Sequence, residues 1–193
     1  MALCIRLGVL SAPMTAKCNC GFYTEIHTER IEHILKCDQS TPLTHTYRHN
    51  LVRDAMIQMA RNYGITTTKE PSCFSYTSGK KQRPDILFHT QPFPLVTDVT
   101  LVASHVSLEL TEKDKISTHN EACSKSHSIF KPLAMHTHGT MGKQGTSLIR
   151  DLSKYVLPCQ QKQFSRSMRH TIAVAAAKGR AESVQAAIDR LWW

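Results

Sequence analysis

Two apolar stretches, each carrying one aspartate, place the strongest constraint on how this chain of 193 residues can fold. Residues 85–89 (DILFH) and 95–102 (LVTDVTLV) have the composition that favours β-strands. The TQPFP segment between them contains two prolines, which belong in a connection and not in a central strand. We therefore expect two neighbouring strands joined by a hairpin-like link, with the side chains of Asp85 and Asp98 converging at one end of a sheet.

The rest of the chain adds helices and two further strands to this pair. Residues 44–64 carry apolar side chains at the spacing of one buried helical stripe, and Gly64 is placed to end that helix. Further strands are predicted at 65–71 and 130–139, and further helices at 107–128, 146–155 and 167–191, the last with an alanine-rich face broken by Gly179. Strands connected through a helical crossover predict a mixed α/β fold, with a central mixed sheet of about four strands flanked by helices.

The two aspartates indicate a metal site if their side chains meet. Paired carboxylates repel each other unless a cation lies between them, and hard oxygen ligands suit Mg²⁺ or Mn²⁺. Such a cation polarises a phosphate and activates water, while a nearby lysine supports the developing charge. The alternative is that Asp85 caps a turn after Pro84 and that Asp98 lies on the surface of an edge strand.

The position of the supporting lysine is open. Thr100 stands two residues beyond Asp98, where a D-x-K arrangement would place a lysine. Lys113 and Lys115, on the following helix, are the nearest candidates, and the alternative for either is a solvated helix face. Glu70, at the end of the first strand of the predicted sheet, is a candidate third carboxylate or an exposed residue.

A cysteine-rich block precedes the predicted sheet. Two cysteines lie on a glycine-containing turn and, twelve residues later, a histidine and a cysteine lie one helical turn apart, an arrangement that fits a closed, structural zinc site. The odd total of seven cysteines favours metal binding in a reducing compartment over a disulfide framework. The expected ligands are Cys18, Cys20, His33 and Cys37, with His27, His45 and His49 as alternative ligands. Three unrelated cysteines are the other interpretation.

The charge of the chain favours a polyanionic partner. Lys and Arg outnumber Asp and Glu by 24 to 15, and nucleic acid is the commonest partner of such a surface. The candidate contacts are Arg48, Lys80, Lys81, Arg83 and Lys143. No run of eighteen apolar residues occurs, so neither a transmembrane helix nor a membrane partner is expected.

Taken in order, these motifs resemble the restriction-endonuclease-like domain of site-specific non-LTR retrotransposons. The resemblance covers roughly residues 4–156 and rests on IRLGV, the cysteine block, RHNLVRDAM, KEP, RPDIL, VTDVTLV and FKPLAMHTHGTMG. The family is similar to PD-(D/E)XK nucleases and is described by a zinc-binding CCHC block, then Pro-Asp, twelve to fourteen residues, and a second Asp. Here Pro84-Asp85 and Asp98 enclose twelve residues.

The resemblance implies a restriction-endonuclease-like core at 44–156, preceded by a zinc-binding segment at 1–43 and followed by a helical extension at 157–193. It implies Mg²⁺-dependent nicking of nuclear DNA, with Asp85 and Asp98 as ligands, so that a reverse transcriptase can prime from the free 3′ end. The segment ELTEKDKISTHNEACSKSH departs from the basic, alanine-rich helix common in the family, which leaves the catalytic lysine unassigned. The rival interpretations are an inactive or domesticated nucleic-acid-binding module and a zinc-stabilised protein-interaction domain.

Overall fold

The computed structural model describes Cys20, His33 and residues 44–76 and 83–191. Its helices are α3 (Thr44–Asn62), α4 (Leu108–Lys125), α5 (Lys143–Ser153) and α6 (Gln161–Leu191), with a short 3-10 helix η2 (Pro158–Gln160) before α6. Its strands are β1 (Thr67–Lys69), β2 (Ile86–Phe88), β3 (Leu95–Thr97), β4 (Val99–Val102), β5 (Ile129–Phe130) and β6 (Leu133–His136). Each predicted helix is present, although α5 and α6 begin at 143 and 161 and not at 146 and 167, and two of the four predicted strands are each divided into two.

The sheet is mixed, as predicted from the helical crossover. Four strands lie in the order β1-β2-β3-β5, in which β2 pairs antiparallel with β1 and β3 while β5 pairs parallel with β3. A second, two-stranded sheet consists of β4 and β6 in parallel. Because Asp98 alone separates β3 from β4, one extended segment pairs with β2 and β5 in its first half and with β6 in its second. The sheet therefore forks at Asp98.

The last predicted strand is divided in the same way. Residues 130–139 were expected to form one strand, but the chain forms β5 and β6 with Lys131 and Pro132 between them. Proline has no N–H to donate to a strand ladder, which explains the interruption. The two halves then follow the two halves of the forked segment, β5 beside β3 and β6 beside β4.

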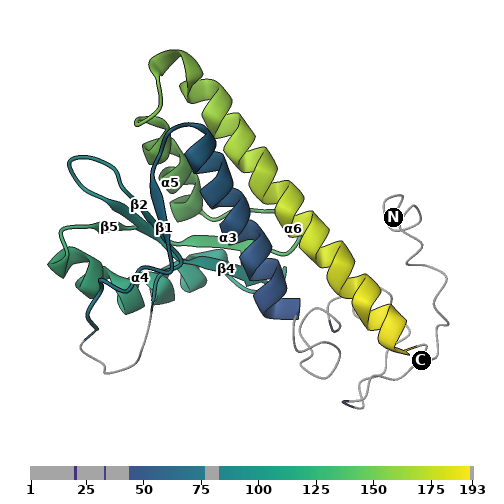
Figure 1. The fold of residues 1–193 in the computed structure, drawn as a ribbon. Helices are drawn as coiled ribbons and strands as arrows, with labels where there is room; N and C mark the ends of the chain where they lie inside the picture. Colours follow the sequence, from purple (N-terminus) through teal and green to yellow (C-terminus); the bar gives the residue numbers. More distant parts are fainter. Residues whose placement is uncertain (1–19, 21–32, 34–43, 77–82, 192–193) are drawn as a thin grey trace.

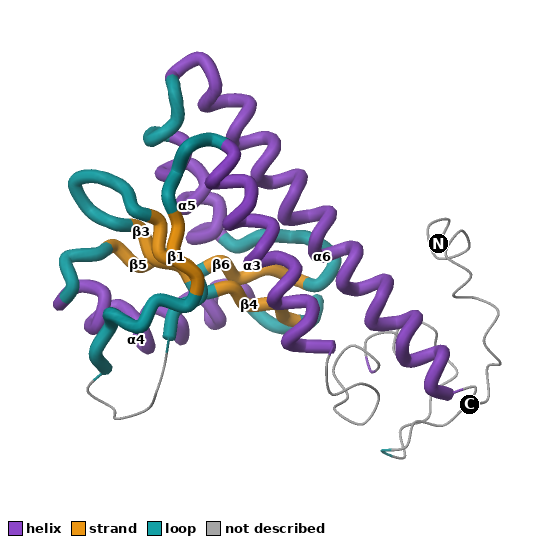
Figure 2. Tube along the Cα trace, in the orientation of Figure 1, coloured by secondary structure: helices purple, strands orange, loops and turns teal. Residues whose placement is uncertain are grey.

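Helices cover both faces of the sheet (Figures 1 and 2). Alternate residues of a strand point to opposite faces, so Ile86 and Phe88 enter one core while Leu87 enters the other. The first core joins the sheet to α3, α5 and α6, and the second joins it to α4 through Ala122 and Cys123. The result is three layers, with the sheet in the middle.

Helices α3 and α6 pack antiparallel along their lengths (Figure 1). At one end the Tyr63 and Phe164 rings meet edge to face with centroids 5.1 Å apart, and at the other the Tyr47 hydroxyl donates to Glu182 Oε2 at 2.7 Å. The segment expected as a C-terminal extension supplies fully buried side chains to the main core, among them Phe164, Met168 and Ile172. Helix α6 thus forms one wall of that core.

Two glycines have defined roles in this helix pair. Gly64 has φ +81° and its N–H donates to Arg61 O at 2.9 Å, which ends α3 as predicted. Gly179 lies inside α6, where this helix meets α3, and the helix continues through it as the sequence predicted. A Cβ at this position would lie 3.0 Å from Arg48 Cγ and 3.3 Å from Arg48 Cα. Glycine therefore allows the two helices to approach closely.

Candidate active site

Asp85 directly precedes β2 and is held rigidly across the sheet. It is 7% exposed, and its N–H donates to Thr97 O at 3.0 Å. Its carboxylate has two partners: Oδ1 lies 2.9 Å from His49 Nε2, and Oδ2 accepts from the Val99 N–H at 2.6 Å. The first amide of β4 and the first turns of α3 thus fix this carboxylate, which is buried and does not cap a surface turn.

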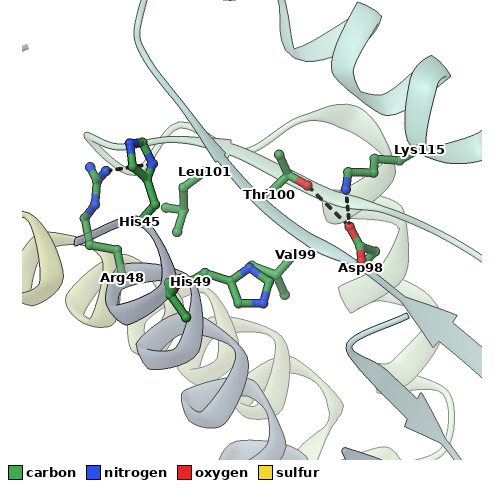
Figure 3. Close-up of a pocket in the computed structure, with 9 residues that line it drawn as sticks. His45, Arg48, His49, Asp98, Val99, Thr100, Leu101 and Lys115 are labelled. Carbon is green, nitrogen blue, oxygen red and sulfur yellow. Dashed lines mark hydrogen bonds and ion pairs between the residues drawn. The ribbon is translucent and has the colours of Figure 1, made fainter. Parts of the chain in front are cut away.

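Asp98 occupies the fork between β3 and β4 and is also 7% exposed. Its Oδ2 lies 2.7 Å from Lys115 Nζ and accepts from Thr100 Oγ1 at 3.5 Å (Figure 3). Its Oδ1 faces His119 Nε2 at 3.8 Å. Because the strand is interrupted at Asp98, this carboxylate lies inside the sheet and still contacts side chains of α4.

The two aspartates are close enough for the charge of Asp85 to affect the ionisation of Asp98. Burial raises the pKa of Asp98, and the negative charge of Asp85 raises it further, against the opposing effect of Lys115. The hydrogen bond to Asp85 raises the pKa of His49, with a smaller contribution from the charge of Asp98. Two buried carboxylates that repel each other form a favourable position for a cation.

The donor set fits Mg²⁺ or Mn²⁺. Both are hard cations that prefer carboxylate oxygens, and Mg²⁺ commonly binds through one or two carboxylates while keeping several water ligands. Within residues 44–76 and 83–191, three or more His, Cys, Asp or Glu side chains do not gather into a complete metal cage. Asp85 and Asp98 would hold the ion, and water or phosphate oxygens would supply its other ligands.

A cleft with a cavity volume of about 350 Å³ opens beside Asp98 (Figure 3). The start of α3 forms one wall, β4 forms another, and Lys115 reaches in from α4. The lining residues are His45, Thr46, Arg48, His49, Asp98, Val99, Thr100, Leu101 and Lys115. Basic or imidazole side chains make up four of these nine, so the carboxylate lies in a cleft suited to a phosphate-bearing ligand.

The structure separates the two candidate lysines and places Glu70 outside the cleft lining. Lys115 reaches Asp98, whereas Lys113 pairs with Glu109 at 2.9 Å on the exposed side of α4. The Glu70 carboxylate pairs with Arg53 Nη1 at 2.6 Å and does not line the cleft. Of these three candidates, the structure brings Lys115 to the carboxylates, while other charged groups hold Lys113 and Glu70.

The candidate DNA contacts fall in different places. Arg48 is only 3% exposed and lines the cleft, since it packs against α6 at Gly179, so it is not the outer-surface contact that was expected. Arg83, two residues before Asp85, and Lys143, at the start of α5, are exposed. Lys80 and Lys81 lie outside the described residues.

Sequence reasoning missed three residues around the carboxylates. His49 was considered only as a zinc ligand, although its place beside Arg48 in the opening turns of α3 was a signal that it lies near the cleft. His119 and Tyr76 gave no signal, because 43 positions separate them in the chain. The Tyr76 hydroxyl lies 2.6 Å from His119 Nδ1, and His119 is 3% exposed.

This Tyr76–His119 pair has a defined protonation. Burial lowers the pKa of His119 to about 4 and raises the pKa of Tyr76 to about 12, so both are neutral at pH 7. The phenol oxygen and Nδ1 share one hydrogen bond whose direction depends on the imidazole tautomer, and Nε2 of the same ring faces Asp98 Oδ1 at 3.8 Å. The pair is thus an uncharged neighbour of one of the two expected metal ligands.

The cysteine block is described at two of its four expected zinc ligands. Cys20 Sγ lies 3.3 Å from His33 Nε2, near the separation of about 3.5 Å that follows from tetrahedral zinc with ordinary Zn–S and Zn–N lengths. Cys18, Cys37 and the alternative ligand His27 lie outside the described residues. His45 and His49, which the sequence also allowed as zinc ligands, line the cleft beside Asp98.

Comparison with known proteins provides no relative from which a function can be taken. No known protein family matches the chain, and no curated protein is significantly similar to it. In the described part of the chain, no helix is long and apolar enough to cross a membrane.

Proposed function

We propose that this protein is a metal-dependent DNA endonuclease with a PD-(D/E)XK-type site, in which Asp85 and Asp98 bind Mg²⁺ or Mn²⁺. The observation that supports it most lies at the fork of the sheet: the buried Asp85 accepts from the Val99 amide next to the buried Asp98, and Lys115 reaches Asp98 itself. The proposed target is nuclear DNA, and the proposed partner in a retrotransposition reaction is a reverse transcriptase supplied in cis or in trans. The cysteine block serves as a structural zinc site.

The position of Lys115 replaces the missing lysine of a D-x-K arrangement. Thr100 occupies the strand position two residues after Asp98, and its hydroxyl only donates weakly to that carboxylate. Lys115 brings an ammonium group to the same carboxylate from α4, with a side chain that is 33% exposed and so accessible to a ligand in the cleft. A lysine from a helix can therefore support the developing negative charge as one from the strand would.

The other residues of the site have positioning and binding roles. His49 and the Val99 amide orient Asp85, and the cleft around them presents Arg48 and His45 to phosphate groups beside the scissile one. When bound, the cation polarises the phosphate and lowers the pKa of its water. The chain's own contribution is a fixed pair of carboxylates and a set of cations along one cleft.

The test is nicking of supercoiled plasmid with Mg²⁺ or Mn²⁺, using Lys113→Ala as the matched control for Lys115→Ala. We expect the wild type and Lys113→Ala to nick equally, and Lys115→Ala to lose about 10²-fold or more in rate. The Asp85→Ala/Asp98→Ala variant is expected to be inactive. Equal loss in the two lysine variants, or wild-type nicking by the double aspartate variant, would contradict the proposal.

A second candidate function is DNA binding without cleavage. It is favoured by one observation: Lys115 and His49 already contact the two carboxylates, so the folded chain itself supplies a partner for each of them. This module would bind DNA through the basic cleft with a strong dependence on salt. Salt-sensitive binding by the wild type, with no metal-dependent nicking, would select it.

A further inference from the structure

Most of α6 lies in a long segment of the chain without acidic residues. No Asp or Glu occurs between Asp151 and Glu182, and this interval contains six Lys or Arg residues. Four of the six recur along α6 at i, i+4, i+7 and i+18, the spacing of one side of a helix. We call these four residues the α6 basic stripe: Lys162, Arg166, Arg169 and Arg180.

Helix α4 provides a comparison within the same molecule, because its solvent-exposed charges form ion pairs along the helix. Its exposed Lys113 and Lys125 pair with Glu109 and Glu121 four residues earlier, at 2.9 and 2.6 Å. Within the described part of the chain, no residue of the α6 basic stripe has an ion pair or a side-chain hydrogen bond. The charges of α4 are thus balanced locally, whereas those of the stripe are not.

The stripe is accessible and unobstructed. Lys162, Arg166 and Arg169 are exposed, and Arg180 is partly exposed. On the same side, between Arg169 and Arg180, stands the exposed Ala173, whose small side chain leaves room for a ligand to approach the helix. The four charged positions extend over about 27 Å of helix, the length of about eight base pairs of DNA.

The surroundings of α6 select the class of partner. An interfacial membrane helix needs a free apolar face, but Phe164, Met168 and Ile172 are fully buried in the core. A row of phosphates is the ligand that matches several unpaired cations on one straight line. Gly179, the residue before Arg180, packs against Arg48, where an added Cβ would lie 3.0 Å from Arg48 Cγ. Because Arg48 lines the candidate active-site cleft, the stripe ends near that cleft.

We propose that the α6 basic stripe binds the phosphate backbone of duplex DNA outside the candidate active site. The choice of DNA rests on the proposed function, and the surface itself is separate from the carboxylates and Lys115. Phosphate contacts of this kind position a duplex without reading its sequence. The stripe would hold the DNA while the cleft contacts the strand near Asp98.

The test compares two variants that remove the same charge. Lys162→Gln/Arg166→Gln/Arg169→Gln removes three charges from the stripe, and Lys113→Gln/Lys125→Gln/Lys178→Gln removes three paired charges from other faces. Binding to a fluorescent duplex of about 30 base pairs is measured in EDTA over a range of salt, so that cleavage plays no part. We expect the stripe variant to bind DNA about tenfold or more weakly than the wild type, and the control variant to bind almost as well as the wild type. The slope of log K against log salt should become less steep by about 2.7 in the stripe variant, because three phosphate contacts are lost.

Three outcomes would overturn the proposal. These are equal loss of affinity in both variants, unchanged binding by the stripe variant, and wild-type binding to polyglutamate but not to DNA, which would indicate an acidic protein partner. Plasmid nicking separates this proposal from the nuclease. If the stripe variant binds DNA weakly and the wild type does not nick, the stripe proposal is supported and the nuclease proposal is contradicted. If the wild type nicks and the stripe variant binds DNA normally, the nuclease proposal is supported and the stripe proposal is contradicted.

Discussion

Replacing Asp98 by Asn is expected to stabilise the fold while abolishing nicking. Asn has the same shape, so the packing at the fork of the sheet is preserved. Burial raises the pKa of Asp98, the charge of Asp85 raises it further, and Lys115 only partly compensates. Because the folded-state pKa lies above the unfolded value, the ionised carboxylate at pH 7 opposes folding. Asp98→Asn removes this cost.

The expected gain is of order 1 kcal/mol at pH 7 in EDTA. The lost pair with Lys115 subtracts little, because that side chain is 33% exposed and remains solvated. For a chain of this size the gain corresponds to a rise in Tm of about 2–4 °C. The difference from the wild type should shrink as pH falls through the folded pKa of Asp98, and vanish below the unfolded pKa, where the carboxyl is protonated in both states.

The assay is urea denaturation at several pH values, with Asp54→Asn as the control of opposite sign. Partial burial raises the pKa of Asp54, but hydrogen bonds from Arg53 and Lys69 outweigh it and leave the pKa lowered. Asp54→Asn should therefore lower stability at pH 7 by roughly 0.5 kcal/mol, and that loss should disappear as pH falls through the folded pKa of Asp54. A clear loss of stability in Asp98→Asn at pH 7 would refute the reasoning, since the pair with Lys115 would then outweigh burial.

Three further predictions concern the supports of the site. Glu112→Ala should lower the free energy of unfolding by about 1–3 kcal/mol, measured in urea with the exposed Glu121→Ala as the control. The buried Glu112 Oε1 accepts from the Gln144 N–H at 2.8 Å in the first turn of α5. The N-cap residue of α5 is a glycine, which has no side chain to accept this bond. Gly179→Val should cost about 1–3 kcal/mol and lower nicking as well, because the added carbons push α3 away; wild-type Tm and nicking would contradict this. Tyr76→Phe removes the hydrogen-bond partner of His119 Nδ1, so it should lower nicking with little change in Tm and shift the tautomer equilibrium of His119, which ¹⁵N NMR of the imidazole reports. An unchanged tautomer would contradict the last prediction.

The features that the sequence predicted depend on neighbours along the chain. The helix at 44–62 follows from its apolar spacing, and the strands at 86–88 and 95–102 follow from composition and the prolines between them. The meeting of Asp85 with Asp98 was foreseeable for the same reason, because a short link leaves their two strands adjacent. Local pattern was sufficient wherever the partner lay a few residues away.

The features that it missed depend on packing between distant segments. Lys113 and Lys115 are two positions apart and point to different sides of α4. Which of them contacts Asp98 depends on the rotation of α4 about its axis when it packs against the sheet. The contact of Tyr76 with His119 joins a loop to a helix and has no periodic signature. The early start of α5 has a similar cause, because its cap comes from Glu112 on another helix.

The place of α6 in the core affects how the newly made chain folds. Phe164, Met168 and Ile172 close a core whose other walls are α3 and the sheet, yet they leave the ribosome after all of those elements. Until α6 is synthesised, Val52 and Met56 of α3 lack one of the surfaces that cover them, and such exposed apolar surface promotes aggregation. Folding of the main core therefore waits until α6 has left the ribosome, and a nascent chain arrested before residue 161 should remain sensitive to protease and bound to chaperones.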